Sequence, residues 1–396
     1  MLFVFASYGD NYIPFLSVAL DSLLKEHPND NVNVLWADTS IIEVNLLKIA
    51  FPSVNFIQEP IEITHYSEIE RIPIKLRMWA SMCRRTTEEY ICFLDTDIIV
   101  LKNISKYLDR SADFIYTWKK ETFPINAGVI IVRTSEKVSK FLELWSQKSD
   151  EILHNKEQFE EARNKNGGAN QHSLVTILKK INIFEGGKLD FEFGTLKFKG
   201  IPCKELNQTN SVPINSGSHI LHYKGGWRPI ILENAGYTTN RSKETSHEMK
   251  EYWEERYKDF NERLLSKTFK DLTLGSLEEK FKDLGVTRIL RVSSNELGEV
   301  KKEIEKAKNS CGIIISGKIG TKESEFIKSL ILECNNIKFI YLENVKYLDF
   351  DKSIDRLYKF ENNILILPNS RDRFKLISTT SSNWLSKLAS FRSSSH

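Results

Sequence analysis

The chain has 396 residues, of which 41% are hydrophobic, 28% charged and 11% aromatic. This composition is typical of a globular protein and excludes collagen, coiled coils and wholesale disorder. Because 56 Lys and Arg residues nearly balance 53 Asp and Glu residues, giving a net charge of +3, no global field marks the chain as a nucleic-acid binder. We therefore predict no nucleic-acid partner and expect a local site to hold any anionic ligand.

The first part of the chain alternates apolar runs with segments of helical periodicity. The apolar runs predict strands at Leu2–Ala6, Val32–Ala37, Tyr90–Leu94, Phe114–Trp118 and Ala127–Val132. The periodic segments predict helices at Ile13–Leu24, Ile72–Met82 and Val138–Trp145. Such alternation predicts an α/β domain with a mostly parallel sheet, whose ligands gather at the carboxyl ends of the strands.

The later part of the chain is first highly charged and then repeats the alternation of strands and helices in shorter form. Residues 241–282 are highly charged with scattered aromatic residues, which predicts a helical connector. Beyond it, strands are predicted at Thr287–Val292, Cys311–Ser316, Ile337–Leu342 and Ile364–Leu367, and helices at Leu297–Ala307 and Thr321–Cys334. We therefore predict three parts: an α/β domain over 1–240, the connector over 241–282, and a smaller α/β domain over 283–396 without an assigned role.

The cysteines and the N-terminus favour a cytoplasmic location. The five cysteines are scattered and form no CxxC or Cys/His metal spacing, so we expect reduced, buried thiols. The apolar start, residues 1–6, ends too early for a signal peptide or a membrane span. A basic amphipathic segment at 384–392 fits two alternatives, peripheral membrane contact or packing of the same helix on its own domain.

Two acidic residues, Asp95 and Asp97, interrupt the apolar run of residues 91–100. Burying two like charges without a partner is costly, and a divalent cation would offset that cost. Mn²⁺ and Mg²⁺ prefer carboxylate oxygens and share them with phosphates. An Asp-x-Asp pair also fits a solvated turn, and phosphatases of the haloacid dehalogenase type carry one after an apolar strand. Those phosphatases usually have Thr or Val four residues after the first Asp, where this chain has Ile99.

Four further segments form an ordered pattern with this acidic pair. They are residues 5–12 (FASYGDNY), 124–132 (PINAGVIIV), 167–174 (GGANQHSL) and 219–229 (HILHYKGGWRP). Together, over about residues 1–230, these motifs resemble the nucleotide-sugar-dependent glycosyltransferases of the GT-A fold. The resemblance is greatest to the retaining, family 8-like group that includes glycogenin and bacterial lipopolysaccharide galactosyltransferases.

The resemblance implies a set of donor-binding residues. Those for the nucleotide base and ribose are Ala6, Asp10, Asn11 and Tyr12. A basic residue on the helix before the acidic pair would approach the donor, and Arg77 is preferred there over Lys75. Asn126 and Ala127, in the Asn-Ala-Gly-Val segment, would contact the donor sugar, and the small Gly128 would permit close ligand approach.

The resemblance also implies a three-residue metal site and a phosphate site. Asp95, Asp97 and His222 would be the ligands, and the imidazole favours Mn²⁺ over Mg²⁺. Gly225 would approach the phosphates. Arg228 stands where the family has Lys, which keeps the positive charge beside the departing diphosphate.

One motif departs from the family pattern. Asn170 and His172 replace the two acids of the family's Asp-Gln-Asp, while Gln171 matches and would lie near the anomeric carbon. An amide suits positioning better than covalent catalysis. The implied enzyme is a Mn²⁺-dependent, retaining hexosyltransferase that uses a UDP-sugar and a hydroxyl of a glycan or lipid-linked acceptor. The alternative is a catalytically inactive module that binds nucleotide sugar.

Overall fold

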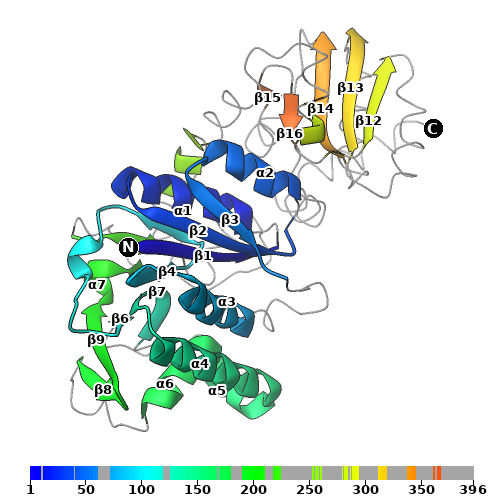
Figure 1. The fold of residues 1–396 in the computed structure, drawn as a ribbon. Coiled ribbons are helices and arrows are strands. Elements are labelled where there is room, and N and C mark those ends of the chain that lie inside the picture. Colours follow the sequence, from blue (N-terminus) through cyan, green and yellow to red (C-terminus); the bar gives the residue numbers. More distant parts are fainter. Residues whose placement is uncertain are drawn as a thin grey trace. The chain divides into compact units, whose positions relative to one another are not determined.

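A computed structural model describes most of the first 223 residues and short pieces beyond them (Figure 1). The described residues are 1–9, 12–39, 41–60, 72–118, 125–166, 169–179, 190–209 and 217–223, with short segments between 252 and 366. Two compact units are present. The first comprises Met1–Thr39, Phe51–Trp227 and Arg241–Glu251, and the second Ser40–Ala50, Arg228–Asn240 and Tyr252–His396. The predicted domain boundaries stay a prediction.

The first unit is built on a mixed sheet in which most strands run in the same direction. Its described strands follow the order β3-β2-β1-β4-β7-β6-β9-β8. Their bounds are β1 Leu2–Tyr8, β2 Asn31–Ala37, β3 Val54–Gln58, β4 Tyr90–Leu94, β6 Phe114–Trp118, β7 Ile125–Arg133, β8 Phe191–Phe193 and β9 Leu196–Pro202. The α/β class is confirmed, and the five apolar runs predicted as strands all form strands of this sheet.

The expectation of a mostly parallel sheet is confirmed, with β7 and β8 as the exceptions among the described strands. β1, β2, β3 and β4 run parallel, but β7 is antiparallel to both β4 and β6, and β8 is antiparallel to β9. The residues of β7 are apolar because both faces of the strand are covered, and such a run indicates burial without indicating direction.

Helices cover both faces of this sheet (Figure 1). α1 (Ile13–Glu26) lies on one face, and α3 (Ile72–Arg85), α4 (Glu136–His154), α5 (Lys156–Asn166) and α6 (Ala169–Lys179) lie on the other side. α1 has a proline in its first turn, where the missing N–H costs nothing. α4 is longer than predicted, because Ser135 caps it by accepting from the Val138 N–H, and a polar last turn extends it to His154.

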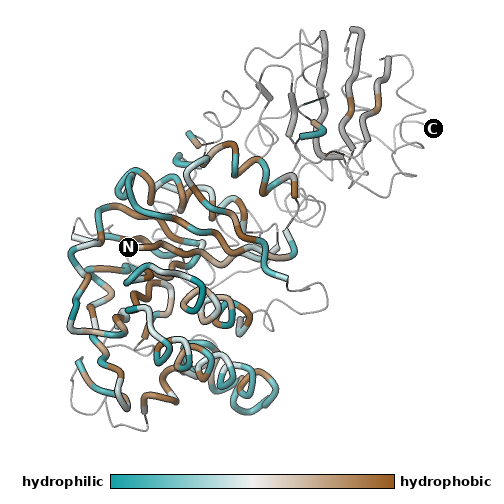
Figure 2. Tube along the Cα trace, in the orientation of Figure 1, coloured by the Kyte–Doolittle hydropathy of each residue, from teal (hydrophilic) through white to brown (hydrophobic). Residues whose placement is uncertain are grey.

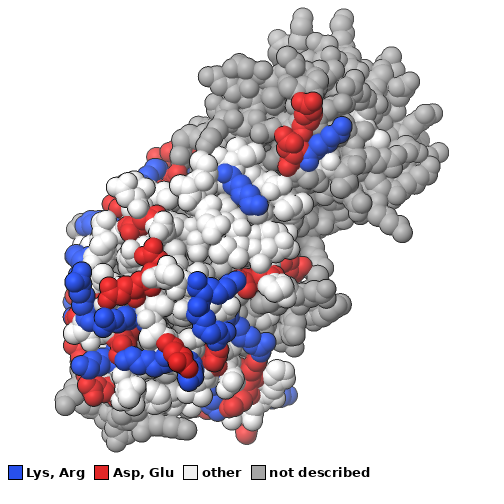
Figure 3. Space-filling model, viewed as in Figure 1, with Lys and Arg blue, Asp and Glu red and all other residues white. Residues whose placement is uncertain are grey.

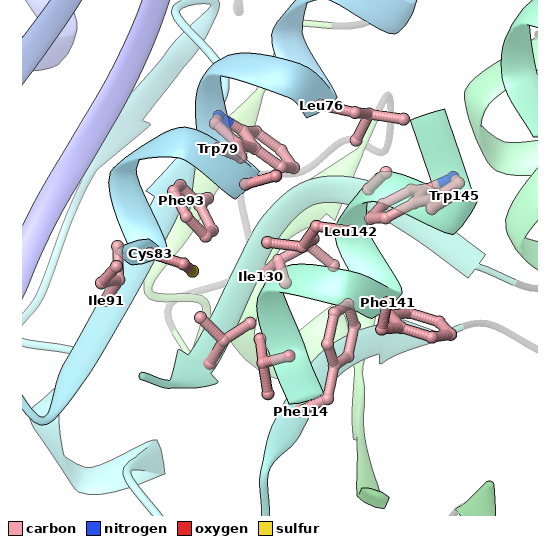
Figure 4. Close-up of a cluster of buried hydrophobic side chains, with 14 of the residues drawn as sticks. Leu76, Trp79, Cys83, Ile91, Phe93, Phe114, Ile130, Phe141, Leu142 and Trp145 are labelled. Carbon is pink, nitrogen blue, oxygen red and sulfur yellow. The ribbon is translucent and has the colours of Figure 1, made fainter. Parts of the chain in front are cut away.

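The core beneath α3 and α4 is rich in aromatic side chains (Figure 4). The Trp79 ring of α3 stacks on Phe93 of β4 with centroids 4.7 Å apart, and Phe114 of β6 meets Phe141 of α4 edge-on at 5.4 Å. Such pairs add to the stabilisation from burial alone. The central strands are accordingly hydrophobic along their length, whereas α4 and α5 alternate in hydropathy (Figure 2).

Trp145 connects this core to α6 and provides a stability prediction. Its side chain is fully buried, and Nε1 donates to the Asn170 carbonyl at 2.6 Å. Trp145→Phe should lower the free energy of unfolding by about 1–2 kcal/mol, through the lost hydrogen bond and a small void. Urea unfolding followed by circular dichroism measures this. The neighbouring Leu144, 43% exposed, is the control: Leu144→Ala should change the value by less than about 0.5 kcal/mol, and an equal loss in both variants would contradict the account.

The second unit contains a smaller sheet. Its described strands follow the order β12-β13-β14-β16-β15, with β12 (Arg288–Ser293), β13 (Cys311–Lys318) and β14 (Ile337–Asn344) parallel. β16 (Ile364–Ile366) pairs antiparallel with both β14 and β15 (Phe360–Glu361). The four predicted strands are confirmed. α2 (Ile41–Ala50) belongs to this unit, where Asn45 donates to the Asp283 carbonyl. The predicted helices at 297–307 and 321–334 and the 384–392 segment lie outside the described residues.

Three of the predicted buried thiols are confirmed. Cys83, Cys92 and Cys203 are free and buried, and burial raises the pKa of the Cys83 thiol to about 12, so this thiol stays protonated and unreactive. Among the helices that the structure describes, none combines the length and apolar character needed to cross a bilayer.

Candidate metal centre

The acidic pair lies between two strands at the carboxyl edge of β4. β4 ends at Leu94 and β5 (Ile98–Val100) begins four residues later, so Asp95 and Asp97 occupy the turn between them. The Asp95 N–H donates to the Gly128 carbonyl at 2.9 Å, and the Asp97 carbonyl accepts from the Tyr223 N–H at 2.8 Å. Asp97 is only 2% exposed. The pair is therefore held by backbone contacts and is not a solvated surface turn.

A second, small sheet brings His222 to the pair. β11 (Ile220–His222) runs antiparallel to β5 and parallel to β10 (Gln208–Thr209), with His222 opposite Ile98. The imidazole Nε2 lies 3.4 Å from Asp97 Oδ1 and 3.6 Å from Asp95 Oδ2. One ligand atom from each of the three residues lies within 4.8 Å of the others. The structure thus brings the three predicted ligands together across more than a hundred residues of sequence.

The imidazole of His222 supports a metal at this position. Its side chain is fully buried, and neither ring nitrogen has a hydrogen-bond partner in the part of the chain that the structure describes. A buried polar group without a partner is costly and uncommon. Two carboxylates and one imidazole supply oxygen and nitrogen donors, which suit Mn²⁺ better than Mg²⁺. The residues present therefore fit a divalent transition-metal ion.

Gly128 makes room for this imidazole. A Cβ on Gly128 would lie 2.1 Å from His222 Cε1 and 2.5 Å from its Nδ1, far inside contact distance. The β6–β7 register jumps between Tyr116, opposite Ile130, and Thr117, opposite Asn126. This irregularity contains Gly128, whose N–H donates to Asn126 Oδ1 at 2.9 Å. Glycine at this position leaves room for the His222 imidazole, a role that the sequence alone does not indicate.

Lys75, and not the preferred Arg77, contacts the acidic pair. Lys75 Nζ donates to Asp95 Oδ1 at 2.6 Å and lies 4.7 Å from the centroid of the Trp79 ring. Arg77 is 56% exposed and pairs with Asp150 of α4. That ion pair belongs to the charged outer surface, where basic and acidic side chains intermix (Figure 3). A role for Arg77 at the donor stays a prediction.

Hydrogen bonds behind the site position the predicted sugar-contacting residues. Asn126 and Ala127 are both 2% exposed. Thr117 Oγ1 donates to the Asn126 carbonyl at 2.8 Å and accepts from Asn207 Nδ2 at 3.3 Å. Sequence reasoning missed Thr117 and Asn207. The one available signal was a threonine near the end of an apolar strand, where a polar group needs a partner.

The relay formed by the hydrogen bonds of Thr117 to Asn126 and Asn207 gives a second stability prediction. Thr117→Val keeps the shape of the side chain but leaves the buried Asn126 carbonyl and Asn207 amide without their shared partner. We expect a loss of about 1–2 kcal/mol in the free energy of unfolding, measured in urea. Thr176→Val is the matched control, because the Thr176 hydroxyl bonds only to the His172 carbonyl within α6. If both variants lose equal stability, the relay is not a special feature of the site.

The segment in which Asn170 and His172 depart from the family pattern forms the first turn of α6. The Asn170 carbonyl accepts from Trp145 Nε1, and its side-chain Oδ1 accepts from the Gln171 N–H at 2.8 Å. Gln171 and His172 are 3% and 7% exposed. The structure therefore anchors this turn firmly to α4. The roles of Asn170 and Gln171 in chemistry stay predictions.

The predicted nucleotide residues are described in part. Ala6 lies in β1 opposite Leu35 of β2 and is 7% exposed. Tyr12 directly precedes α1, and its ring meets that of Tyr8 edge-on at 6.2 Å. The other predicted contacts to nucleotide or phosphate, Asp10, Asn11, Gly225 and Arg228, lie outside the described residues. Their roles stay predictions.

The fold and site define an α/β protein with a largely buried Asp-Asp-His cluster. No protein-family model matches the chain, and no curated protein matches it either.

Three solved structures that resemble this chain are glycosyltransferases. GlyE of Streptococcus pneumoniae TIGR4 is 13% identical, with 87% of this chain and 80% of that chain covered and a TM-score of 0.44. The galactosyltransferase LgtC, solved with donor and acceptor sugar analogs, is 15% identical, with 71% and 100% covered and a TM-score of 0.40. A glycosyltransferase involved in glycosylation of the PBCV-1 major capsid is 14% identical, with 57% and 94% covered and a TM-score of 0.35. All three TM-scores are below 0.5.

Proposed function

We propose that the first unit is a GT-A glycosyltransferase domain that transfers a hexosyl group from a UDP-sugar to an acceptor hydroxyl with a bound Mn²⁺. The observation that carries the proposal is the buried His222 imidazole. Its two nitrogens have no hydrogen-bond partner among the described residues, while Nε2 faces Asp95 and Asp97. A phosphatase of the haloacid dehalogenase type does not require a histidine such as His222 beside its acidic pair. The sequence motifs around the pair supply the donor class.

The three side chains would hold the metal ion and leave the remainder of its coordination shell to the donor diphosphate. When bound, the ion would supply Lewis-acid stabilisation of the negative charge on the leaving diphosphate. Asp95, Asp97 and a neutral His222 carry a formal charge of −2, which a divalent cation balances. The diphosphate then needs further positive charge from the protein, for which Arg228 is the proposed source.

The chain's other residues would orient the sugar between donor and acceptor. In the proposed reaction, the bond between the anomeric carbon and the diphosphate oxygen breaks, and a bond to the acceptor oxygen forms as the acceptor hydroxyl passes its proton to an oxygen of the leaving diphosphate. Buried Asn126 and Ala127 would contact the donor sugar. Asn170 would hydrogen-bond a sugar hydroxyl, and Gln171 would lie near the anomeric carbon on the acceptor side. Retention of configuration, by front-face attack, follows from the family resemblance. The proposed acceptor is a glycan or a lipid-linked sugar.

A screen of nucleotide sugars tests the proposal. With no acceptor present, we expect one UDP-sugar to be hydrolysed slowly to UDP and free sugar, and the hydrolysis to require Mn²⁺. Asp97→Asn should abolish the release. Release of inorganic phosphate from a phosphomonoester, lost in Asp95→Asn, would instead identify a phosphatase.

A binding module without catalysis is the second candidate. It is favoured by Asn170, which stands where the family has an acid and whose Oδ1 accepts from the Gln171 N–H. An amide cannot accept a proton or supply negative charge. Mn²⁺-dependent UDP-sugar binding without hydrolysis or transfer to any acceptor would select this candidate.

A further inference from the structure

In the proposed metal-bound state, the two carboxylate oxygens of Asp95 face different cations, the Lys75 ammonium and the metal ion. Oδ1 accepts from Lys75 Nζ at 2.6 Å, while Oδ2 is directed to the imidazole of His222, 3.6 Å away. We infer that Lys75 is a built-in counter-cation of the acidic pair, which competes electrostatically with the divalent ion and so weakens its binding. The inference rests on the proposed metal site and adds a residue that sets the strength of that site.

The ammonium of Lys75 is fixed in position. Its side chain is 10% exposed, and Nζ lies over the ring of Trp79, one helical turn further along α3. Trp79 is itself fully buried and stacks on Phe93 of β4. A cation over an aromatic face gains a favourable interaction. Lys75 is therefore held beside Asp95 by packing as well as by charge.

The charges around the Lys75–Asp95 contact determine its effect on metal binding. Asp97 is almost fully buried, and Asp95 is 17% exposed at its side chain, so their mutual repulsion is poorly screened. Without a divalent ion, Lys75 reduces the formal charge of the cluster from −2 to −1, which stabilises the fold. With the ion bound, the same ammonium stands close to a second positive charge. Lys75 therefore favours the metal-free protein over the loaded one.

If Lys75 instead orients a metal ligand, its removal should change the Mn²⁺ affinity in the opposite direction. A residue that merely orients a metal ligand strengthens binding, and its removal typically weakens metal affinity about 10–100-fold. Removal of a competing cation must instead tighten binding. The direction of the change in Mn²⁺ affinity therefore separates the two roles without any measurement of turnover.

The experiment is Mn²⁺ titration calorimetry on the full chain, without nucleotide, combined with thermal unfolding in EDTA and in Mn²⁺. Lys75→Gln keeps a hydrogen-bond donor and removes the charge. We expect it to bind Mn²⁺ about tenfold more tightly than the parent protein and to unfold at a lower temperature in EDTA. Lys75→Arg, which keeps the charge, should stay close to the parent in both measurements. Lys140→Met, at an exposed position of α4 paired with Glu136, controls for loss of a surface lysine.

Each result decides the inference. Equal or weaker Mn²⁺ binding by Lys75→Gln overturns it while leaving the metal site intact. Failure of every protein, including the parent, to bind Mn²⁺ overturns the metal site as well. If Lys75→Gln folds only with Mn²⁺, or if Lys75→Gln/Asp95→Asn regains stability in EDTA, charge balance is supported. If Lys75→Gln fails to fold in either condition and the double variant also fails, Lys75 acts through packing and the inference is wrong.

Discussion

Replacing Asp97 by asparagine is expected to abolish Mn²⁺ binding while leaving the chain folded. The substitution keeps the shape of a 2% exposed side chain but removes one of two anionic ligands. Because loss of residues that only support a ligand already costs 10–100-fold, loss of a ligand itself should weaken Mn²⁺ binding at least about 100-fold. Calorimetric titration of UDP in the presence of Mn²⁺ should show the same loss, since the diphosphate would have no ion to share.

Folding provides the check on this result. Asp97→Asn also removes a buried like-charge repulsion, so stability without metal should be unchanged or higher. The control is Asp109→Asn, at a partly exposed carboxylate paired with Lys199, which should bind Mn²⁺ and UDP like the parent. UDP affinity that is equal with and without Mn²⁺ in the parent, or unaffected by Asp97→Asn, would contradict the proposed site.

Gly128→Ala is expected to have an effect of similar size through a single methyl group. The new Cβ would overlap the imidazole of His222, with Cε1 only 2.1 Å away. The backbone of His222 is held by the β5–β11 pairing, so the ring has to rotate away from Asp95 and Asp97. We expect Mn²⁺ affinity to fall at least about 100-fold and the free energy of unfolding to fall by about 1–3 kcal/mol, the usual cost of overpacking.

A double variant locates the clash. If the cost of Gly128→Ala arises from the imidazole, then Gly128→Ala/His222→Ala should be about as stable as His222→Ala alone. Additive losses would show that the methyl group collides with something else. Gly194→Ala is the matched control: its φ of +59° makes alanine strained, but a Cβ there meets nothing within 4 Å. It should cost about 1 kcal/mol of stability and leave Mn²⁺ affinity unchanged.

The parts of the fold that could be predicted from the sequence are those with local signals. β1, β2, β4, β6 and β7 are apolar runs buried on both faces, and α1 and α3 show apolar residues at helical spacing. The direction of β7 could not be predicted, because it depends on the strands beside it. The same holds for the β5–β11 pairing, which joins segments more than a hundred residues apart and comprises only three residues from each strand.

Lys75 illustrates a signal that was present in the sequence. Trp79 is four residues after Lys75, so both lie on the core-facing side of α3, and the side chain of Lys75 reaches Asp95. Arg77 lies seven residues before Arg84, on the outer side, where the two arginines pair with Asp150 and Glu143 of α4. Helical periodicity alone favours Lys75. The role of Gly128 beside His222 carried no such signal, since it depends on an irregular register between β6 and β7.

Electron spin-echo spectroscopy of Mn²⁺ bound to the full chain, with UDP added, tests the central claim most directly. We predict a ¹⁴N coupling from the His222 imidazole together with a ³¹P coupling from the diphosphate, and loss of the ¹⁴N coupling alone in His222→Ala. A bound Mn²⁺ that shows no nitrogen coupling in the parent protein, or one whose nitrogen coupling survives in His222→Ala, would contradict the account.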